Sequence, residues 1–139
     1  EHLSEADDDQ LLTLGSHLYT HYNVKTLSDQ DLAEQYDENA IALAKYKRYL
    51  PVFAFPFGHP GACFSMNQAA FLKRKGATRL FTNFPRPNSD QTAEVLDRIA
   101  LTNSHDRDSR LWFQILKNPL TQMLGRSGTN WDYRQEDSF

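Results

Sequence analysis

The amino-acid sequence predicts an α/β fold in which short strands alternate with helices. Apolar runs of strand length occur at 11–15, 52–55 and 77–82, and each borders a Gly or a Pro. Between these runs, apolar residues recur at helical spacing over 29–47, and the segment "MNQAAFLKRKG" at 66–76 predicts a second helix that stops at Gly76. The chain of 139 residues has the length of one domain. This order of elements is typical of a mostly parallel sheet covered by helices, either an open sheet or part of a barrel.

The first part of the chain predicts one strand and one helix. Residues 1–10 are acidic, and we expect a loose segment or the end of a helix there. The apolar run at 11–15 predicts a short buried strand that stops at Gly15. Ser28, followed by Asp31, resembles a capping box and predicts the start of a helix. The apolar face of that helix consists of Leu32, Tyr36, Ala40, Leu43 and Leu50.

The middle of the chain continues the alternation. Pro56 and Gly58 follow the apolar run at 52–55, which fits a buried strand that ends in a tight turn. A second helix and a third strand are expected next. Two prolines then predict a loop at 83–90, and the segment "VLDRIALT" at 95–102 predicts one more strand.

The last part of the chain predicts a helix and a tail. Apolar residues on one side of 105–118 predict a helix that ends at Pro119. Residues 126–139 show no periodicity, and we expect a mobile tail there. The predicted organisation is a single α/β domain at 1–125 followed by this tail.

Charge and composition exclude several functional classes. The formal net charge is −3, and no helix face gathers several Lys or Arg, so nucleic acid is not an expected partner. No run approaches the roughly 20 apolar residues that a membrane span needs, and no charged-then-apolar leader is present. The one cysteine, Cys63, excludes an internal disulfide and is expected to be buried. The compartment, cytoplasm or cell envelope, is left open.

Two histidines mark the candidate site. His17 and His21 lie four residues apart, just after the first predicted strand, and "PFGHPG" at 56–61 follows the next strand in the same way. In parallel α/β folds the chemistry gathers at the carboxyl ends of the strands. Two neutral imidazoles can hold one zinc or related cation if the turn between them is helical or tightly curled. The spacing alone favours two surface or capping histidines, because a pair of this kind arises easily by chance.

The residues around these histidines resemble a known family. The stretch "LTLGSHLYTHYNVKTLSDQDLAE" is similar to the second signature of the polysaccharide deacetylases with NodB homology, a carbohydrate esterase family. That signature has a strand, Gly-Ser-His, a second His four positions on, then Asn, a Leu-Ser pair and a helix. The strand and turn "VFAFPFG" resemble the third signature, and "FLKRKGATRLFT" is similar to the helix, glycine and strand that follow it. Order and intervals agree over roughly residues 11–103.

The resemblance implies a fold, an activity and a set of site residues. The fold is part of a deformed (β/α) barrel of the polysaccharide deacetylase type, with the N-terminal strands missing. The activity is removal of N-acetyl groups from an N-acetylated oligo- or polysaccharide, using one divalent metal held by an Asp and two His. Zn2+ is the first expectation for that metal, and Co2+, Ni2+ or Mn2+ are alternatives. Carried over by motif, His17 and His21 are the imidazole ligands, and the backbone N–H of Phe57 is the oxyanion donor.

These assignments agree with the general chemistry of amide hydrolysis. A bound metal lowers the pKa of water to about 7 and polarises the acetyl carbonyl. A turn that contains Pro fixes a backbone N–H toward the tetrahedral intermediate at little reorganisation cost. The rings of Phe55 and Phe57 either flank the sugar or belong to the core.

The sequence also departs from the family. The Asp-Asp signature at the end of the first strand, which carries a metal ligand and the base, is absent. The acidic run at 7–9 is expected to be a surface segment, because Asp9 lies too close to His17 for a separate parallel strand and its crossover. Leu18 stands where the family commonly has Ser or Thr. Ala54 stands where many members have an Arg that steadies the base, although one branch has the same aromatic-Ala-aromatic-Pro turn.

The general acid of the family has no clear counterpart. His59, just after the turn, is a weak candidate by position only. His105 opens a predicted helix, where a capping or surface role fits better.

Two explanations fit the missing signature. The chain is either the C-terminal part of a complete deacetylase, which Glu1 in place of Met favours, or a divergent relative without the acid and the base. An incomplete barrel would leave an open apolar edge, so self-association through that edge is expected. Two other functions stay open: a non-catalytic carbohydrate-binding or interaction domain on the same scaffold, and a different metal hydrolase or a two-His, one-carboxylate iron site.

Overall fold

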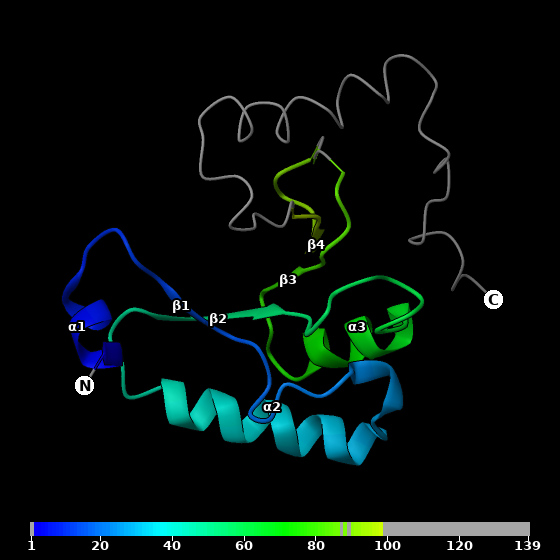
Figure 1. The fold of residues 1–139 in the computed structure, drawn as a ribbon, viewed down its shortest axis with the longest axis horizontal. Helices are drawn as coiled ribbons and strands as arrows, with labels where there is room; N and C mark the ends of the chain where they lie inside the picture. Colours follow the sequence, from blue (N-terminus) through cyan, green and yellow to red (C-terminus); the bar gives the residue numbers. More distant parts are fainter. Residues whose placement is uncertain (1, 87, 89, 99–139) are drawn as a thin grey trace.

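The computed structural model describes residues 2–86, 88 and 90–98 (Figure 1). The helix predicted at 105–118, the tail at 126–139 and the second half, 99–102, of the strand predicted at 95–102 lie outside the described residues.

Within the described residues the chain is mixed α/β, as predicted. The strands are β1 (Leu14–Ser16), β2 (Tyr49–Ala54), β3 (Arg79–Phe81) and β4 (Val95–Leu96). The helices are α1 (His2–Asp8), α2 (Asp29–Leu43) and α3 (Met66–Arg74), with the 3-10 turn η1 (Val24–Thr26) before α2. None of these helices is long and apolar enough to cross a membrane.

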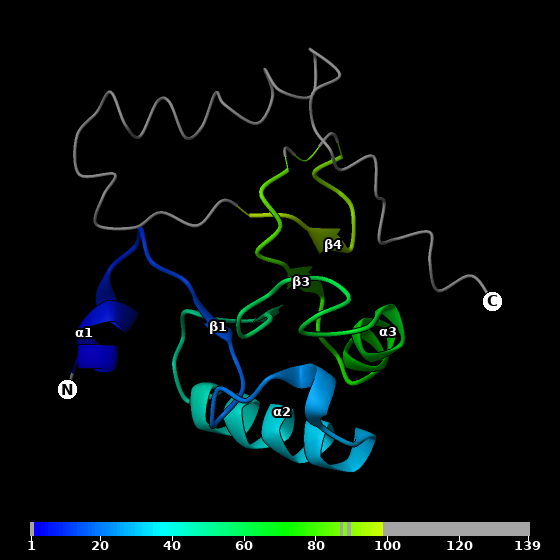
Figure 2. The ribbon, with the colours of Figure 1, turned by 45° about the vertical axis from the view of Figure 1, so that its right-hand side comes forward.

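The four strands form one parallel sheet in the order β1-β2-β3-β4. Neighbours in the sheet are thus neighbours in the sequence, and the crossovers from β1 to β2 and from β2 to β3 contain α2 and α3. Figures 1 and 2 show these two helices beside each other on one side of the strands, while α1 lies apart from them. A sheet that always steps in one direction occurs in open sheets and in barrels, so the barrel type stays a prediction.

The first strand differs from its predicted position. It begins at Leu14 and continues to Ser16, whereas Leu11 is 92% exposed and Leu12 is also exposed. The prediction of a buried strand at 11–15 was wrong in its first half because Asp9 holds the chain in a turn there. Its side chain accepts a hydrogen bond from the Leu11 N–H at 2.8 Å, a local contact that competes with strand pairing.

Helix α2 begins where the sequence predicted and ends earlier. The Ser28 hydroxyl accepts a hydrogen bond from the Asp31 N–H at 3.1 Å and caps the helix. The helix ends at Leu43 rather than 47, and Leu50 lies exposed on β2 instead of on the helix face. Leu32 and Tyr36 are buried, as expected.

The core lies between the sheet and these two helices. Phe53, Phe55 and Phe64 are its largest fully buried side chains, and the rings of Phe55 and Phe64 stack with centroids 3.7 Å apart. Cys63 is buried and free, which confirms its expected role as a small core residue. Side chains that are fully buried around the three rings are Val24, Leu32, Leu72 and Leu80.

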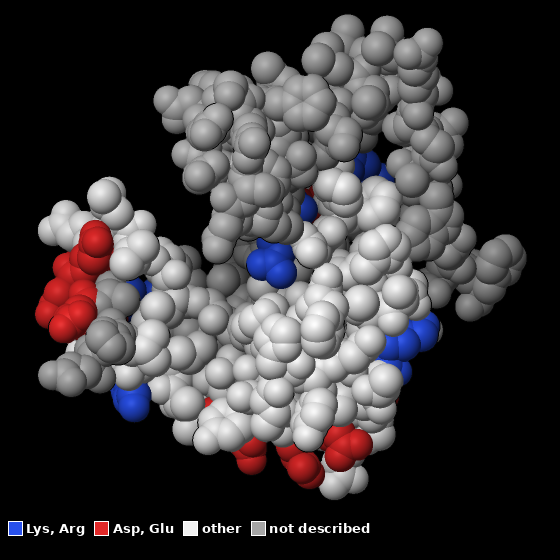
Figure 3. Space-filling model, in the orientation of Figure 1, with Lys and Arg blue, Asp and Glu red and all other residues white. Residues whose placement is uncertain are grey.

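The acidic run at 7–9 lies on the surface, as expected. Figure 3 shows Asp and Glu side chains gathered over α1 and along α2. The Asp7 carboxylate accepts hydrogen bonds from the Lys47 and Arg48 N–H groups, and Asp8 pairs with the Lys47 ammonium at 2.6 Å. These carboxylates therefore bind the segment of chain that leads into β2.

Candidate metal centre

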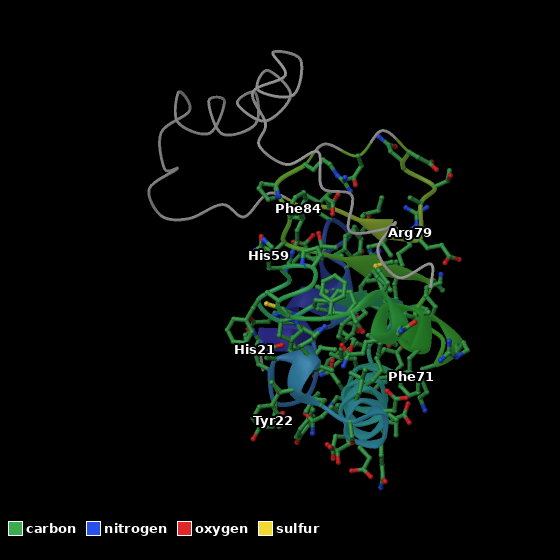
Figure 4. All side chains as sticks on the ribbon, turned by 90° about the vertical axis from the view of Figure 1, so that its right-hand side faces the viewer. His21, Tyr22, His59, Phe71, Arg79 and Phe84 are labelled. Atoms are coloured by element: carbon green, nitrogen blue, oxygen red, sulfur yellow. The ribbon has the colours of Figure 1, made fainter. Side chains whose placement is uncertain are left out.

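The carboxyl ends of the parallel strands lie at one edge of the sheet. His17 follows β1, the turn at 55–59 follows β2, and Asp97 and Arg98 follow β4. Figure 4 shows His21 and His59 on the same side of the molecule, with Arg79, the first residue of β3, on the other side. This edge is where chemistry is expected in parallel α/β folds.

His17 is fixed by the neighbouring strand. Its Nδ1 atom donates to the carbonyl oxygen of Ala54, the last residue of β2, over 2.7 Å. With the proton on Nδ1, the lone pair lies on Nε2, the nitrogen then able to bind a cation. A backbone carbonyl behind the distal nitrogen is a common support for metal-binding imidazoles.

His21 lies against His17. The centroids of the two rings are 4.7 Å apart, and the ring planes meet at 73°. The turn between them is tightly curled rather than helical, with φ of 64° at Leu18 and 58° at His21. Residues other than Gly rarely adopt this left-handed conformation, and it is concentrated at functional sites.

The unusual conformation of Leu18 has a packing reason. Its side chain is 5% exposed and belongs to the core cluster. A Leu therefore occupies this position, where the resembling family commonly has Ser or Thr, because the turn directs it inward. On the same turn His17 is half-buried and His21 is exposed.

Helix α2 supports the turn through two amide side chains. The Asn39 Oδ1 atom accepts from the Ser16 hydroxyl at 2.6 Å and from the His17 N–H at 3.1 Å. The Gln35 Oε1 atom accepts from the Thr20 N–H at 3.0 Å. The sequence did not point to either amide, although a polar Asn39 beside the apolar face of the helix is a signal that could have found it.

The turn after β2 places Phe57 beside the histidine pair. Phe57 has φ of 59°, and the Gly58 N–H donates to the Pro56 carbonyl at 2.6 Å, so these residues form a γ-turn centred on Phe57. The Phe57 ring is exposed and contacts the His21 ring with centroids 4.9 Å apart. Among the described residues, no acceptor takes the Phe57 N–H.

The two phenylalanines of this turn have different environments. Phe55 is fully buried and stacked on Phe64, so the hypothesis that it flanks a sugar was wrong. Strand alternation sends its side chain into the core. Phe57 is the member of the pair that reaches solvent.

His59 lies at the same edge but in a separate contact. Its Nδ1 atom donates to the Pro60 carbonyl at 2.9 Å, and its ring meets the Phe84 ring at 5.8 Å between centroids. No ring contact within the described residues joins His59 to His17 or His21. His105, the other histidine considered for an acid role, lies outside the described residues.

The electrostatics of the edge favour neutral imidazole at His17. Burial is the main cause that lowers the pKa of His17, and the positive charges of His21 and Arg98 act in the same direction. The hydrogen bond to Ala54 opposes this shift. A neutral imidazole is the form that binds a metal.

Two charged residues at the end of β4 were missed by the sequence analysis. The Asp97 side chain is buried, pairs with Arg86 at 2.9 Å and accepts from the Thr82 hydroxyl at 2.7 Å. The Arg98 guanidinium turns back across the strand ends, where Nε donates to the Thr82 carbonyl at 2.8 Å. Both lie in "VLDRIALT", which the hydrophobic pattern marked only as a strand.

The described residues supply two imidazoles and no complete ligand set. Among 2–86, 88 and 90–98 there is no group of three or more His, Cys, Asp or Glu side chains placed to hold a metal ion. The histidine pair fits part of a zinc site in donor type and proximity. Comparisons of the chain with protein-family models, with curated proteins and with solved structures found no match.

Proposed function

We propose that this chain is the histidine-bearing part of a metal-dependent hydrolase that removes N-acetyl groups from an amino-sugar glycan, in the manner of a polysaccharide deacetylase. The observation that carries the proposal is the shared position of two imidazoles. His17 and His21 lie 4.7 Å apart between ring centroids at the carboxyl edge of a parallel sheet, although the curled turn could have sent them apart.

The two histidines would hold the cation. The Ala54 carbonyl fixes the tautomer of His17, and Asn39 fixes the main chain on which it stands, so little has to reorganise when a metal binds. Zn2+, or Co2+, Ni2+ or Mn2+ in its place, would supply a Lewis acid for the acetyl carbonyl and a water of lowered pKa.

Phe57 would provide the donor for the developing oxyanion. Its N–H lies in a γ-turn in which the ring of Pro56 fixes one φ angle and the Gly58 N–H donates to the Pro56 carbonyl. A donor that is already fixed stabilises charge without a reorganisation cost. The exposed Phe57 ring beside His21 then forms one wall for the acetylated sugar. His59 remains a weak candidate for the acid, since its Nδ1 is held by Pro60 and its ring is exposed to solvent.

One observation also favours the second function, a non-catalytic carbohydrate-binding domain. Three large aromatic side chains are more than half exposed on the loops that follow β1 and β2. They are Tyr19, Tyr22 and Phe57. Figure 4 shows Tyr22 on the same side as His21. Exposed rings of this kind suit the apolar faces of sugar rings.

Acetate release separates the two functions. Protein that carries every residue of the native gene is incubated with N-acetylglucosamine oligomers and each of the four metals, and the free acetate is measured. The proposal expects acetate with at least one metal and a large loss in His17→Ala and in His21→Ala. The control Gln30→Ala, an exposed position on α2 that contacts Glu34, is expected to leave the rate unchanged.

Binding of the oligomers without acetate release under every metal would contradict the hydrolase and favour the carbohydrate-binding domain. Calorimetric titration of the same protein with the same oligomers supplies that measurement.

A further inference from the structure

The positively charged side chain of Arg98 lies at the same edge of the sheet as His17, and the proposed chemistry gives it no role. Arg98 stands two residues after the end of β4, and its side chain reaches back over the neighbouring strands. Its Nε donates to the Thr82 carbonyl at 2.8 Å, and its Nη2 donates to the Phe55 carbonyl at 3.4 Å. These two contacts place the guanidinium across the carboxyl ends of β2 and β3.

The end of β2 is shared by His17 and Arg98. The Ala54 carbonyl accepts from His17, and the next carbonyl, that of Phe55, accepts from Arg98. Successive carbonyls of a strand point in opposite directions, so the imidazole lies on the β1 side of β2 and the guanidinium on the β3 side. The guanidinium and the His17 imidazole therefore flank the end of β2 from opposite sides.

No described carboxylate balances this charge. Asp97 is next to Arg98 in sequence, but its carboxylate is buried and pairs with Arg86. The ion pairs among residues 2–86, 88 and 90–98 do not include Arg98. Arg98 is exposed, and its contacts to described residues engage two of the five N–H donors that a guanidinium carries.

We propose that Arg98 binds a carboxylate of the substrate, so that the glycan is acidic and carries a uronic acid or a similarly carboxylated sugar near the N-acetylated residue. This inference rests on the proposed function, because it specifies the substrate of the same site. A guanidinium held by two main-chain carbonyls offers its free N–H groups to a carboxylate in a fixed plane. Its exposure favours a ligand from solvent over a carboxylate of the protein.

The test is a titration with a charged and an uncharged sugar. D-glucuronate and methyl D-glucoside are titrated into the full chain and followed by amide and guanidinium NMR signals. Arg98→Gln removes the guanidinium, and Arg98→Lys keeps the charge without the planar fork. Arg79→Gln is the matched control, because it removes the same charge from the opposite end of the sheet.

The proposal expects glucuronate to bind the native chain and Arg79→Gln alike, and to bind Arg98→Gln about tenfold more weakly. Arg98→Lys should fall between them, added salt should weaken binding, and methyl glucoside should not distinguish the variants. Equal glucuronate affinity for the native chain and Arg98→Gln would overturn the proposal, and so would equal affinity for the two sugars. Absence of glucuronate binding to the native chain would overturn it as well.

A zinc titration of the same variants separates this inference from the proposed function. Arg98→Gln is expected to bind zinc as the native chain does, which also shows that the variant folds. Protein that carries every residue of the native gene, binds glucuronate through Arg98 and takes up no zinc would overturn the metal-dependent hydrolase and leave Arg98 as an acidic-sugar contact.

Discussion

The imidazole of His17 and the carbonyl of Ala54 join the ends of β1 and β2 through a hydrogen bond of 2.7 Å. The same contact sets which ring nitrogen of His17 is free, because the nitrogen that donates to a carbonyl must carry the proton. A strand-to-strand contact thus fixes both the position and the tautomer of a proposed ligand. The predictions below depend on this arrangement and on the turns that hold it.

Replacing Asn39 is expected to weaken the main-chain support of His17 and so to lower both stability and zinc affinity. Asn39→Ala removes the acceptor of the Ser16 hydroxyl and the His17 N–H, which should lower the free energy of unfolding by about 1 to 2 kcal/mol. Zinc affinity should fall about tenfold, as for other residues that support a ligand. Urea denaturation and zinc calorimetry measure the two effects.

The matched control for this prediction is Asn39→Asp. It keeps a side-chain oxygen for both donors, so zinc affinity should stay close to that of the native chain. Equal loss of zinc binding in Asn39→Ala and Asn39→Asp would show that the side-chain oxygen at position 39 does not support zinc binding.

The stability of the metal-free protein is expected to fall as the pH drops through the range below about 6.5, the ordinary pKa of histidine. Burial, above all, lowers the pKa of His17 in the folded chain. In this range the unfolded chain binds the proton more readily, so the free energy of unfolding decreases as the pH falls. Urea midpoints across this range should change less steeply in His17→Gln. Identical pH profiles for the two proteins would refute the effect.

Gly58 is expected to tolerate no side chain. Its φ is +67°, and a Cβ atom there would lie 2.7 Å from the main-chain nitrogen of Asn83. Gly58→Ala should therefore lower the free energy of unfolding by about 2 to 4 kcal/mol, from both backbone strain and overlap. Gly76 also has a positive φ, +109°, but open space around it, so Gly76→Ala should cost only about 1 kcal/mol. Chemical denaturation measures the free energy of unfolding of both variants. Equal decreases would show that the chain moves to relieve the overlap between the new Cβ atom at position 58 and Asn83.

Tyr36 is expected to titrate later than an exposed tyrosine. Burial raises the pKa of Tyr36 to about 12, with Tyr49 and Asp37 adding to the shift. Above pH of about 10, the ordinary pKa of tyrosine, the folded chain keeps a proton that the unfolded chain loses. This contribution to stability is therefore present below that pH and is lost as the pH rises toward 12. Tyrosinate absorbance should show a late component that Tyr36→Phe removes, and its persistence in that variant would exclude Tyr36 as the source.

Much of the fold could be predicted because local signals agree with it. The Ser28 cap, the apolar spacing of Leu32 and Tyr36, and the alternation of strands with helices all appear in the structure. The strand before His17 was predicted to begin too early, because Leu11 and Leu12 are apolar residues that the structure leaves exposed. Hydrophobic pattern cannot detect a side-chain turn that holds two leucines outside the sheet.

The candidate site was predictable only where it is local in sequence. His17 and His21 stand four residues apart, so a motif finds them, and a tight turn then brings their rings together. Asn39 and Arg98 reach the same edge from a helix and from the last strand, and only the tertiary structure shows this convergence. Phe55 and Phe57 are two residues apart and would share one face of a continued strand, but β2 ends at Ala54 and the turn at Phe57, with φ of 59°, leaves Phe57 exposed while Phe55 stays buried.

A zinc titration by calorimetry tests the central claim most directly. The native chain is compared with His17→Ala and His21→Ala, and with His59→Ala as a control that removes a histidine of the same edge. The account predicts one-to-one binding that is lost in the first two variants and kept in the third. Zinc binding that survives both His17→Ala and His21→Ala, or its absence from the native chain with every residue of the native gene in place, would contradict the account.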